Sequence, residues 1–119
     1  MEDARTHSPH WAERVARAHL EGRGLRHLAS NYRLRGGELD LVMLEGSTVV
    51  VLEVKQRKDA RYGHPAEVLD ARKLKRVQQT ALHYVTYVLR QPDANLRFDA
   101  VTILGDERSY RLEHSKDIG

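Results

Sequence analysis

Three side chains in the middle of the chain, Asp40, Glu53 and Lys55, have the types and spacing that suit a divalent cation and a phosphate. Carboxylate ligands, without cysteine or convergent histidines, favour a hard ion, Mg²⁺ or Mn²⁺. Glu53 and Lys55 are two residues apart, so on a strand both point to one face. There the lysine would orient or help deprotonate a metal-bound water and offset charge on a phosphate.

A β-hairpin would bring these residues together. Glu38 to Leu44 and Thr48 to Lys55 are β-rich runs, and Gly46 suits the first central position of a two-residue type II′ turn. With Gly46 and Ser47 in the turn, paired residues have numbers that sum to 93, so Asp40 faces Glu53 and Glu38 faces Lys55. Like charges directly opposite repel each other, and a cation shared by Asp40 and Glu53 would compensate.

The alternative is an ordinary cross-strand ion pair of Glu38 with Lys55, with both acids facing solvent, because so short a pattern occurs by chance. The neighbouring residues argue for a covered site. In this register one face of the hairpin is wholly apolar, formed by Leu39, Leu41, Met43, Val50, Leu52 and Val54. The other face carries Val42, Leu44, Val49 and Val51 before the charged residues. We therefore expect the acids at the edge of a covered surface.

Periodicity and breakers predict the remaining elements. Ser8-Pro9 resembles a helix start, and Gly22 and Gly24 a stop. We expect helices over about 9–22 and 66–90, strands over 25–34, 96–104 and 108–112, a loop over 56–65, and a final turn through Gly105-Asp106. The order is α-β-β-β-α-β-β in one domain, 1–119, with flexible ends at 1–8 and 115–119.

Composition limits the class of protein. A chain of 119 residues with 40% hydrophobic content fits one core, and its formal net charge of +3 favours a polyanion partner weakly. No cysteine is present, which excludes disulfides and thiolate chemistry and suits a reducing cytosol. No stretch approaches the roughly 18 apolar residues of a membrane span. We expect a soluble, cytoplasmic protein with no membrane contact, and association with the nucleoid stays open.

Basic residues gather around the proposed site. The candidate nucleic-acid contacts are Arg33, Arg35, Arg57, Lys58, Arg61, Arg72, Lys73, Lys75 and Arg76. A solvated charged surface is the alternative. Arg72, Lys75, Arg76 and Gln79 fall on one stripe of the long predicted helix. Tyr84 and Tyr87 on this helix are suited to base stacking, but their place near its apolar stripe favours packing against the sheet or a partner subunit. The seven histidines form no recognised ligand spacing.

The pattern of residues resembles a known family. Asp40 with Glu53-Val54-Lys55 resembles the PD-(D/E)XK signature of the restriction-endonuclease-like superfamily, with Leu39 in place of the signature proline. Gly37-Glu38-Leu39-Asp40 and Glu53-Val54-Lys55-Gln56-Arg57 are similar to the YraN-like family of small bacterial endonuclease-like proteins. The similarity covers most of the chain and extends to Asn31-Tyr32-Arg33, Lys73 and Arg97-Phe98-Asp99.

The resemblance implies a mixed α/β fold with an αβββαβ core, here followed by an additional C-terminal strand. It also implies Mg²⁺- or Mn²⁺-dependent cleavage of DNA, with Asp40 and Glu53 as metal ligands and Lys55 as the catalytic lysine. Glu13 matches an acid on the first helix of the related archaeal Holliday junction resolvases, where it approaches the metal; the alternative is a solvated helix residue. Glu38 is either a partner of Lys55 or an outer metal ligand.

The leading hypothesis is a metal-dependent endonuclease for branched or single-stranded DNA in repair or recombination. The second is a non-catalytic nucleic-acid-binding module that retains the nuclease fold, and the third is a protein-interaction domain. A nuclease that cuts both strands, or a symmetric junction, would most simply act as a twofold homodimer. A metal titration separates the first two, because a binding module needs no divalent ion.

Overall fold

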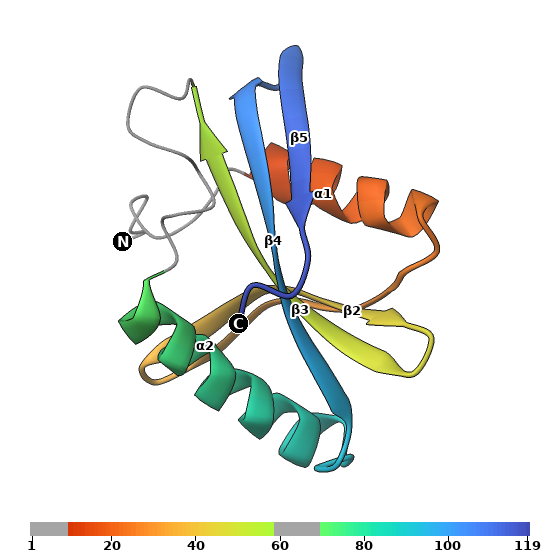
Figure 1. Ribbon diagram of the computed structural model, residues 1–119, viewed down its shortest axis with the longest axis vertical. Coiled ribbons are helices and arrows are strands. Elements are labelled where there is room, and N and C mark those ends of the chain that lie inside the picture. The colour runs from red at the N-terminus through yellow and green to blue at the C-terminus, as the bar shows by residue number, and fades with distance from the viewer. Residues whose placement is uncertain (1–9, 59–69) are drawn as a thin grey trace.

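A five-stranded mixed sheet with a helix on each face forms the fold (Figure 1). The computed structural model describes residues 10–58 and 70–119. Its elements are α1 (His10–Gly22), β1 (Arg26–Leu34), β2 (Gly37–Glu45), β3 (Thr48–Arg57), α2 (Ala71–His83), the π-helical turn η2 (Tyr84–Val88), β4 (Asn95–Asp106) and β5 (Ser109–Ser115). The predicted element order and the mixed α/β fold class, with its additional C-terminal strand, are confirmed.

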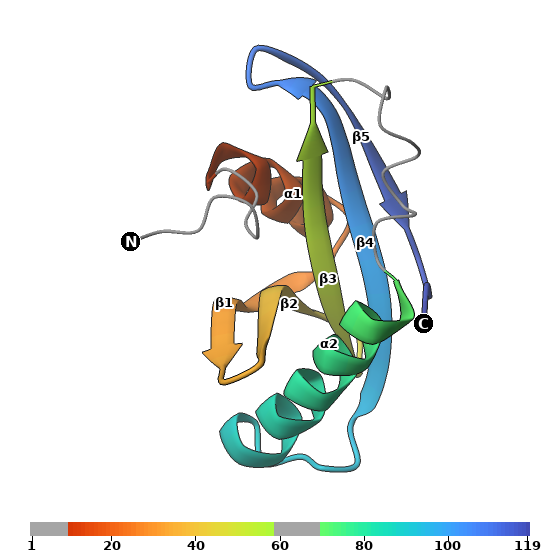
Figure 2. The ribbon, with the colours of Figure 1, turned by 90° about the vertical axis from the view of Figure 1, so that its left-hand side faces the viewer.

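The sheet has the order β1-β2-β3-β4-β5. Its pairs are antiparallel except for β3 and β4, which are parallel and joined by the crossover that contains α2. Figure 2 shows β3, β4 and β5 running side by side, and the β1–β2 hairpin continues the sheet on the other side of β3. No helix in residues 10–58 or 70–119 is long and apolar enough to cross a membrane.

Each helix buries one apolar stripe against its own face of the sheet. On α1, Ala12, Ala16 and Leu20 recur every four residues and pack on a core that includes Leu41 and Leu52. On α2 and η2, a second stripe packs on a separate core formed by the opposite face of the sheet. Its members are Val77, Ala81, Tyr84 and Val85, and they contact Leu39, Val42, Val49, Val51 and Phe98.

The long helix is shorter than predicted. Asp70 caps its start, because its side chain accepts a hydrogen bond from the Lys73 N–H (2.9 Å), so α2 begins at Ala71 and not at Ala66. Residues 66–69, and most of the expected loop over 56–65, lie outside the described residues. At its other end the helix widens into a π turn, where the Leu89 N–H donates to the Tyr84 carbonyl (3.1 Å).

The predicted hairpin register is confirmed near the turn and wrong at the open end. Pairs run from Glu45–Thr48 to Leu41–Leu52 around Gly46, whose φ of 61° suits a primed turn. Beyond Leu41 the ladder ends, so Asp40–Glu53 and Glu38–Lys55 are not backbone pairs. Leu39 also packs in the α2-side core, whereas Leu41 packs on the α1 side, so the expected strict alternation fails at Asp40.

The last turn and the C-terminal end also differ from expectation. The turn lies at Glu107-Arg108 and not at Gly105-Asp106, because the Asp106 carboxylate accepts the N–H groups of Arg108 and Ser109 (2.9 and 3.0 Å). The last strand continues to Ser115 and not only to Leu112, and beyond it the Ile118 N–H donates to the Phe98 carbonyl (2.7 Å), while flexibility of 115–119 stays a prediction. The predicted flexible segment 1–8 lies outside the described residues.

Candidate active site

A cleft of about 510 Å³ opens on the α2 side of the sheet, between the β1–β2 hairpin, the end of β3 and the first turns of α2. Four of the five predicted catalytic residues line it: Glu38, Asp40, Glu53 and Lys55. The other lining residues are Arg33, Leu34, Gly36, Gly37, Lys73, Arg76 and Val77. The structure therefore brings the predicted acids and lysine together, although the pairing that was expected to do so ends before them.

Asp40 is held at the point where β2 and β3 separate. Its carboxylate is 5% exposed, and Oδ2 accepts the Val54 N–H (2.8 Å), which a continued ladder would give to a β2 carbonyl. Burial and the nearby Glu53 charge raise the pKa of Asp40 to about 8, although the Val54 hydrogen bond acts in the opposite direction. Asp40 thus holds a proton at neutral pH unless a cation replaces it.

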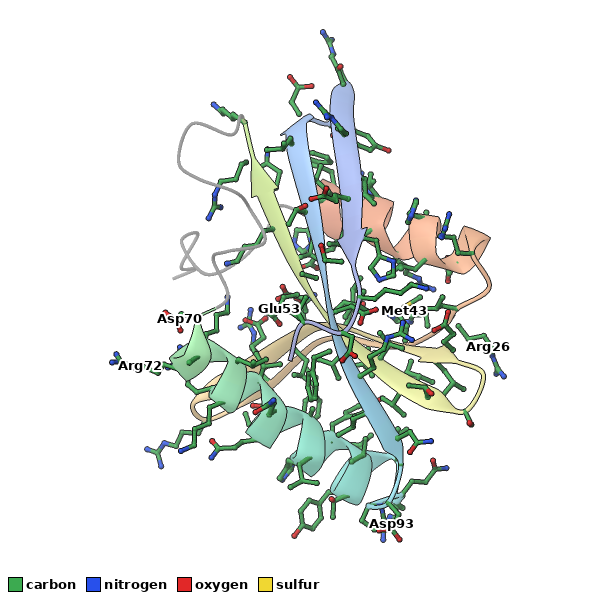
Figure 3. The ribbon with its side chains drawn as sticks, viewed as in Figure 1. Arg26, Met43, Glu53, Asp70, Arg72 and Asp93 are labelled. Atoms are coloured by element: carbon green, nitrogen blue, oxygen red, sulfur yellow. The ribbon has the colours of Figure 1, made fainter. Side chains whose placement is uncertain are left out.

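Glu53 lies on the α2 side of the sheet, facing the first turns of α2 (Figure 3). It is also 5% exposed. Lys73 Nζ lies 3.4 Å from Oε1, while Oε2 is buried without a hydrogen-bond partner among the described residues. Burial raises the pKa of Glu53, and the charges of Lys73 and Lys55 oppose this effect. A buried carboxylate oxygen without a partner is costly, which marks this position as a place for a ligand.

Two lysines partly offset the charge of the two acids. Burial lowers the pKa of Lys55 to about 8, and the hydrogen bond and charge of neighbouring Lys73 act in the same direction. Burial also lowers the pKa of Lys73, but Glu53, Asp40 and Lys55 together outweigh it, so that its pKa is raised. We predicted Lys73 as a nucleic-acid contact; the structure places it inside the cleft, on the Glu53 carboxylate.

Glu13 approaches the same acids from the opposite helix. It is buried on α1, which excludes a solvated helix residue, and its charge helps to raise the pKa of Asp40. Its Oε1 accepts a hydrogen bond from Asn31 Nδ2 (3.1 Å). Asn31 has a left-handed backbone φ of 55°, which asparagine tolerates. The resemblance included Asn31, but this contact was missed because nothing in the sequence shows which segment lies beside α1.

The remaining acid, Glu38, faces Arg33 across the β1–β2 ladder, and its Oε2 accepts a hydrogen bond from Arg33 Nε (3.2 Å). This pair forms part of the rim of the cleft. The register that placed Glu38 opposite Lys55 missed this partner because it considered β2 and β3 alone. Arg33 is therefore both a rim cation and the partner of Glu38.

The predicted basic residues divide into three groups. Arg33, Lys73 and Arg76 line the cleft, and Arg35, Arg72, Lys75 and Lys58 are exposed near it in sequence. Arg72 projects from the start of α2 away from the sheet (Figure 3). Arg57 is half-buried and donates to the Gln56 carbonyl (3.2 Å), and Arg61 lies outside the described residues. Arg33 and Arg76 therefore place positive charge at the acidic cleft, as phosphate binding requires.

The residues present fit a hard divalent cation. In the described part of the chain, no three histidine, aspartate or glutamate side chains are already arranged as a metal site. Asp40 and Glu53 nevertheless supply oxygen ligands, and Glu53 Oε2 is a buried acceptor without a partner. This donor set suits Mg²⁺ or Mn²⁺ better than softer metals.

Comparison with known proteins gives a family. The model described as "Uncharacterised protein family UPF0102" matches residues 12–103. A UPF0102 protein of Pseudomonas entomophila is 46% identical over 94 residues, 79% of this chain and 76% of the relative. The Thermus thermophilus protein is 40% identical over 104 residues, 87% and 89% of the two chains. One from Deinococcus radiodurans is 42% identical over 102 residues, 85% and 83%. The matched region contains every residue of the cleft, and the chain belongs to the UPF0102 family.

Proposed function

We propose that this protein is a divalent-metal-dependent DNA endonuclease, which hydrolyses phosphodiester bonds in branched or single-stranded DNA. One observation carries the proposal: Asp40 and Glu53, each 5% exposed, share a cleft with two lysines, and Glu53 Oε2 has no partner among the described residues. Buried acids that lack full compensation cost folding free energy, and such groups concentrate at functional sites.

Asp40 and Glu53 would hold the cation, with Glu13 adding negative charge behind Asp40. When bound, Mg²⁺ or Mn²⁺ supplies Lewis-acid stabilisation of the phosphate and lowers the pKa of a coordinated water. Lys73 Nζ lies 3.4 Å from Glu53 Oε1, and with a cation held by Asp40 and Glu53 this ammonium would be available to contact the phosphate. The two carboxylates therefore favour a further positive charge that the side chains of the cleft do not supply.

Lys55 is the proposed catalytic lysine. Its side chain lines the cleft next to both acids, and its pKa of about 8 lets it exchange a proton near neutral pH. In its charged form it offsets the negative charge that develops on the phosphate oxygens. Arg33 and Arg76 on the rim would hold the flanking phosphates against the acidic centre.

The test uses purified protein with duplex, flap, single-stranded and four-way DNA, each with Mn²⁺, Mg²⁺ or EDTA. We expect cleavage of at least one substrate with metal and none with EDTA. Glu53→Gln and Lys55→Ala should abolish cleavage, because they remove a metal ligand and transition-state stabilisation, while DNA binding stays within about threefold. Glu107→Gln and Lys116→Ala, which alter exposed residues outside the cleft, are the matched controls.

Undiminished cutting by both cleft variants would exclude this active site. Metal-independent DNA binding without cleavage of any substrate would favour a non-catalytic binding module. A twofold homodimer suits a nuclease that cuts a symmetric junction, and sedimentation of the protein with four-way DNA measures that stoichiometry.

A further inference from the structure

One side of the long helix carries a line of polar and aromatic residues that leads away from the cleft. We call Arg72, Arg76, Gln79, His83 and Tyr87 the helix stripe; they are spaced by four, three, four and four residues. This spacing places side chains on one side of a helix. Arg76 lines the cleft, and Tyr87 lies in the π turn at the far end. The stripe therefore starts with cations at the cleft and ends with aromatic rings.

The aromatic end is held in place from beneath. His83 Nδ1 is hydrogen-bonded to the Tyr32 hydroxyl (2.9 Å), and Tyr32 packs edge-on against buried Tyr84 with ring centroids 5.0 Å apart. The ring of Tyr87 lies 4.6 Å from that of His83 at an angle of 41°. Tyr87 is 66% exposed, more than the other exposed large hydrophobic residues in the described part of the chain. An aromatic ring supported on one side and open on the other is a stacking surface.

The position of this surface fits a nucleic-acid strand in the cleft. Arg76 and Tyr87 are eleven residues apart, about 16 Å along a helix at 1.5 Å per residue, which a few nucleotides of one strand can span. Phosphate-binding cations followed by an exposed ring are the elements with which proteins bind single strands. Bases within a duplex present their edges in the grooves and not their faces, so stacking on Tyr87 requires an unpaired base.

We propose that Tyr87, supported by His83, forms a stacking site for an unpaired base a few nucleotides from the phosphodiester in the cleft. The inference rests on the proposed nuclease function and deepens it, because it selects substrates with a single-stranded segment over continuous duplex. It also revises the prediction for the two tyrosines: Tyr84 packs in the core, as expected, but Tyr87 does not.

The competing occupant is a second copy of this chain. Leu82 and Val88, which are 55% and 51% exposed, lie next to the stripe in sequence, and aliphatic side chains of this kind suit a protein interface. They do not suit base stacking, which needs an aromatic face. Variants of these residues therefore separate the two occupants.

The experiment measures binding of fluorescein-labelled dT12 by anisotropy in EDTA, where no metal-dependent cleavage occurs. Loss of one stacked base costs about 1–3 kcal/mol, so Tyr87→Ala should raise the Kd about 5- to 150-fold, and Tyr87→Phe should restore it to within about twofold. With an abasic oligomer of the same length, Tyr87→Ala should have no effect, because phosphate contacts remain. Leu82→Ala and Val88→Ala are the matched controls.

A direct readout is the fluorescence of Tyr87→Trp in a Trp11→Phe background, which removes the chain's single natural tryptophan. We expect dT12 to quench this indole and the abasic oligomer to leave it unchanged. Equal weakening of dT12 and abasic binding by Tyr87→Ala would overturn the proposal. The proposal would also be overturned if sedimentation showed a dimer and if Leu82→Ala or Val88→Ala abolished both this dimer and the binding of DNA.

The two proposals fail separately. Tyr87-dependent binding of dT12 by a protein that cleaves no DNA with any metal would keep the stacking site and remove the nuclease. Metal-dependent cleavage with no effect of Tyr87→Ala on dT12 binding would keep the nuclease and remove the stacking site.

Discussion

Asp40 performs two tasks that conflict in the metal-free protein. Its Oδ2 accepts the hydrogen bond of the Val54 N–H, and this bond favours a buried position for the carboxylate. Its negative charge lies close to those of Glu53 and Glu13, and this repulsion opposes burial of the charged form. The result is a carboxyl whose pKa is raised to about 8, against about 3.9 in an unfolded chain. Between these values the folded protein keeps a proton that the unfolded chain has released.

This difference fixes the pH dependence of stability. Because the folded state binds more protons than the unfolded state from about pH 4 to about pH 8, the contribution of Asp40 to the unfolding free energy falls as pH rises through that window. Asp40→Asn removes the titration and keeps an oxygen for Val54. We predict that it raises both the melting temperature and the free energy of unfolding of the metal-free protein, the free energy by on the order of 1 kcal/mol at pH 8 and less at pH 5.

Metal provides the control for this prediction. Mn²⁺ should raise the melting temperature of the unmutated protein, since it binds the folded state, and Asp40→Asn should respond much less. Differential scanning fluorimetry at pH 5 and pH 8, with EDTA or Mn²⁺, measures all of these quantities. An advantage for Asp40→Asn that is the same at both pH values, with equal responses to Mn²⁺, would show that Asp40 is not the proton-holding metal ligand.

At this scale the sequence predicted which residues meet but not how they are held. Residue types and the turn at Gly46 predicted that Asp40 and Glu53 lie together in one site, although the backbone pairing expected to join them ends at Leu41 and Leu52. The partners that set their protonation come from distant segments, Lys73 from α2 and Glu13 from α1. Side-chain periodicity shows which face of an element is buried, but it does not show which residues of two elements meet.

At the scale of elements, the β1–β2 hairpin and α2 form the walls of the cleft and touch closely at Gly37. A Cβ at this position would collide with Thr80 Oγ1 and lie 3.3 Å from the Arg76 carbonyl, which already accepts the Thr80 hydroxyl (2.8 Å). The hairpin can lie this close to the helix because residue 37 has no side chain.

We predict that Gly37→Ala lowers the free energy of unfolding by about 1–3 kcal/mol, because the added methyl group forces the hairpin away from α2. Urea denaturation measures the loss. Gly22→Ala is the matched control, since a Cβ there meets no atom within 4 Å, and it should be close to neutral. Equal effects of the two substitutions would mean that hairpin and helix are not in close contact.

The exposed cations of α2 carry a second prediction at this scale. Charge reversal at Arg72, Lys75 and Arg76 should weaken binding to all DNA sequences to a similar degree, as loss of phosphate contacts does. In a plot of the logarithm of the binding constant against the logarithm of the salt concentration, the magnitude of the slope should fall by about 0.7–0.9 for each lost phosphate contact. Arg111→Glu on β5 is the control, and an unchanged slope in the triple variant would move the DNA-binding surface away from α2.

The elements themselves were mostly predictable because each has a clear local signal, such as the β-branched run Val49, Val50 and Val51 in β3 or the spacing of Ala12, Ala16 and Leu20. The boundaries that were missed depend on single side chains. Asp70 caps α2, and Asp106 moves the last turn by two residues. An aspartate in a polar segment gives no sign, before the fold is known, of which N–H it will accept.

At the scale of the whole molecule, one buried carboxylate joins distant segments. Asp99 on β4 is 1% exposed, and its carboxylate accepts hydrogen bonds from Nε and Nη2 of Arg97 (3.0 and 2.9 Å). Nη1 of the same arginine donates to Glu45 at the end of β2 (2.6 Å). Asp99 is also hydrogen-bonded to His114 Nε2 on β5 (2.8 Å) and to the Asp117 N–H (2.9 Å). These contacts connect the C-terminal end to the sheet, which its polar sequence did not predict.

Burial raises the pKa of Asp99, but its hydrogen bonds to Arg97, the Asp117 N–H and His114 outweigh this effect, and the net pKa is lowered. Its contribution to stability is therefore present above the unfolded pKa of about 3.9 and is lost as pH falls through the lower folded value. Asp99→Asn removes the charge of one of the two carboxylates that pair with the half-buried Arg97, the other being Glu45, and breaking a buried pair costs about 3–5 kcal/mol.

We predict that Asp99→Asn lowers the stability by about 3 kcal/mol or more at pH 7, and by less as the pH falls below about 4. Hydrogen exchange at the Ile118 N–H should accelerate more than exchange in α1, because that bond depends on the attached C-terminal segment. Asp93→Asn, in the exposed loop before β4 (Figure 3), is the control. Binding of dT12 per folded molecule should not change, because Asp99 does not line the cleft. An Asp99→Asn protein as stable as Asp93→Asn would show that this network does not hold the C-terminal end.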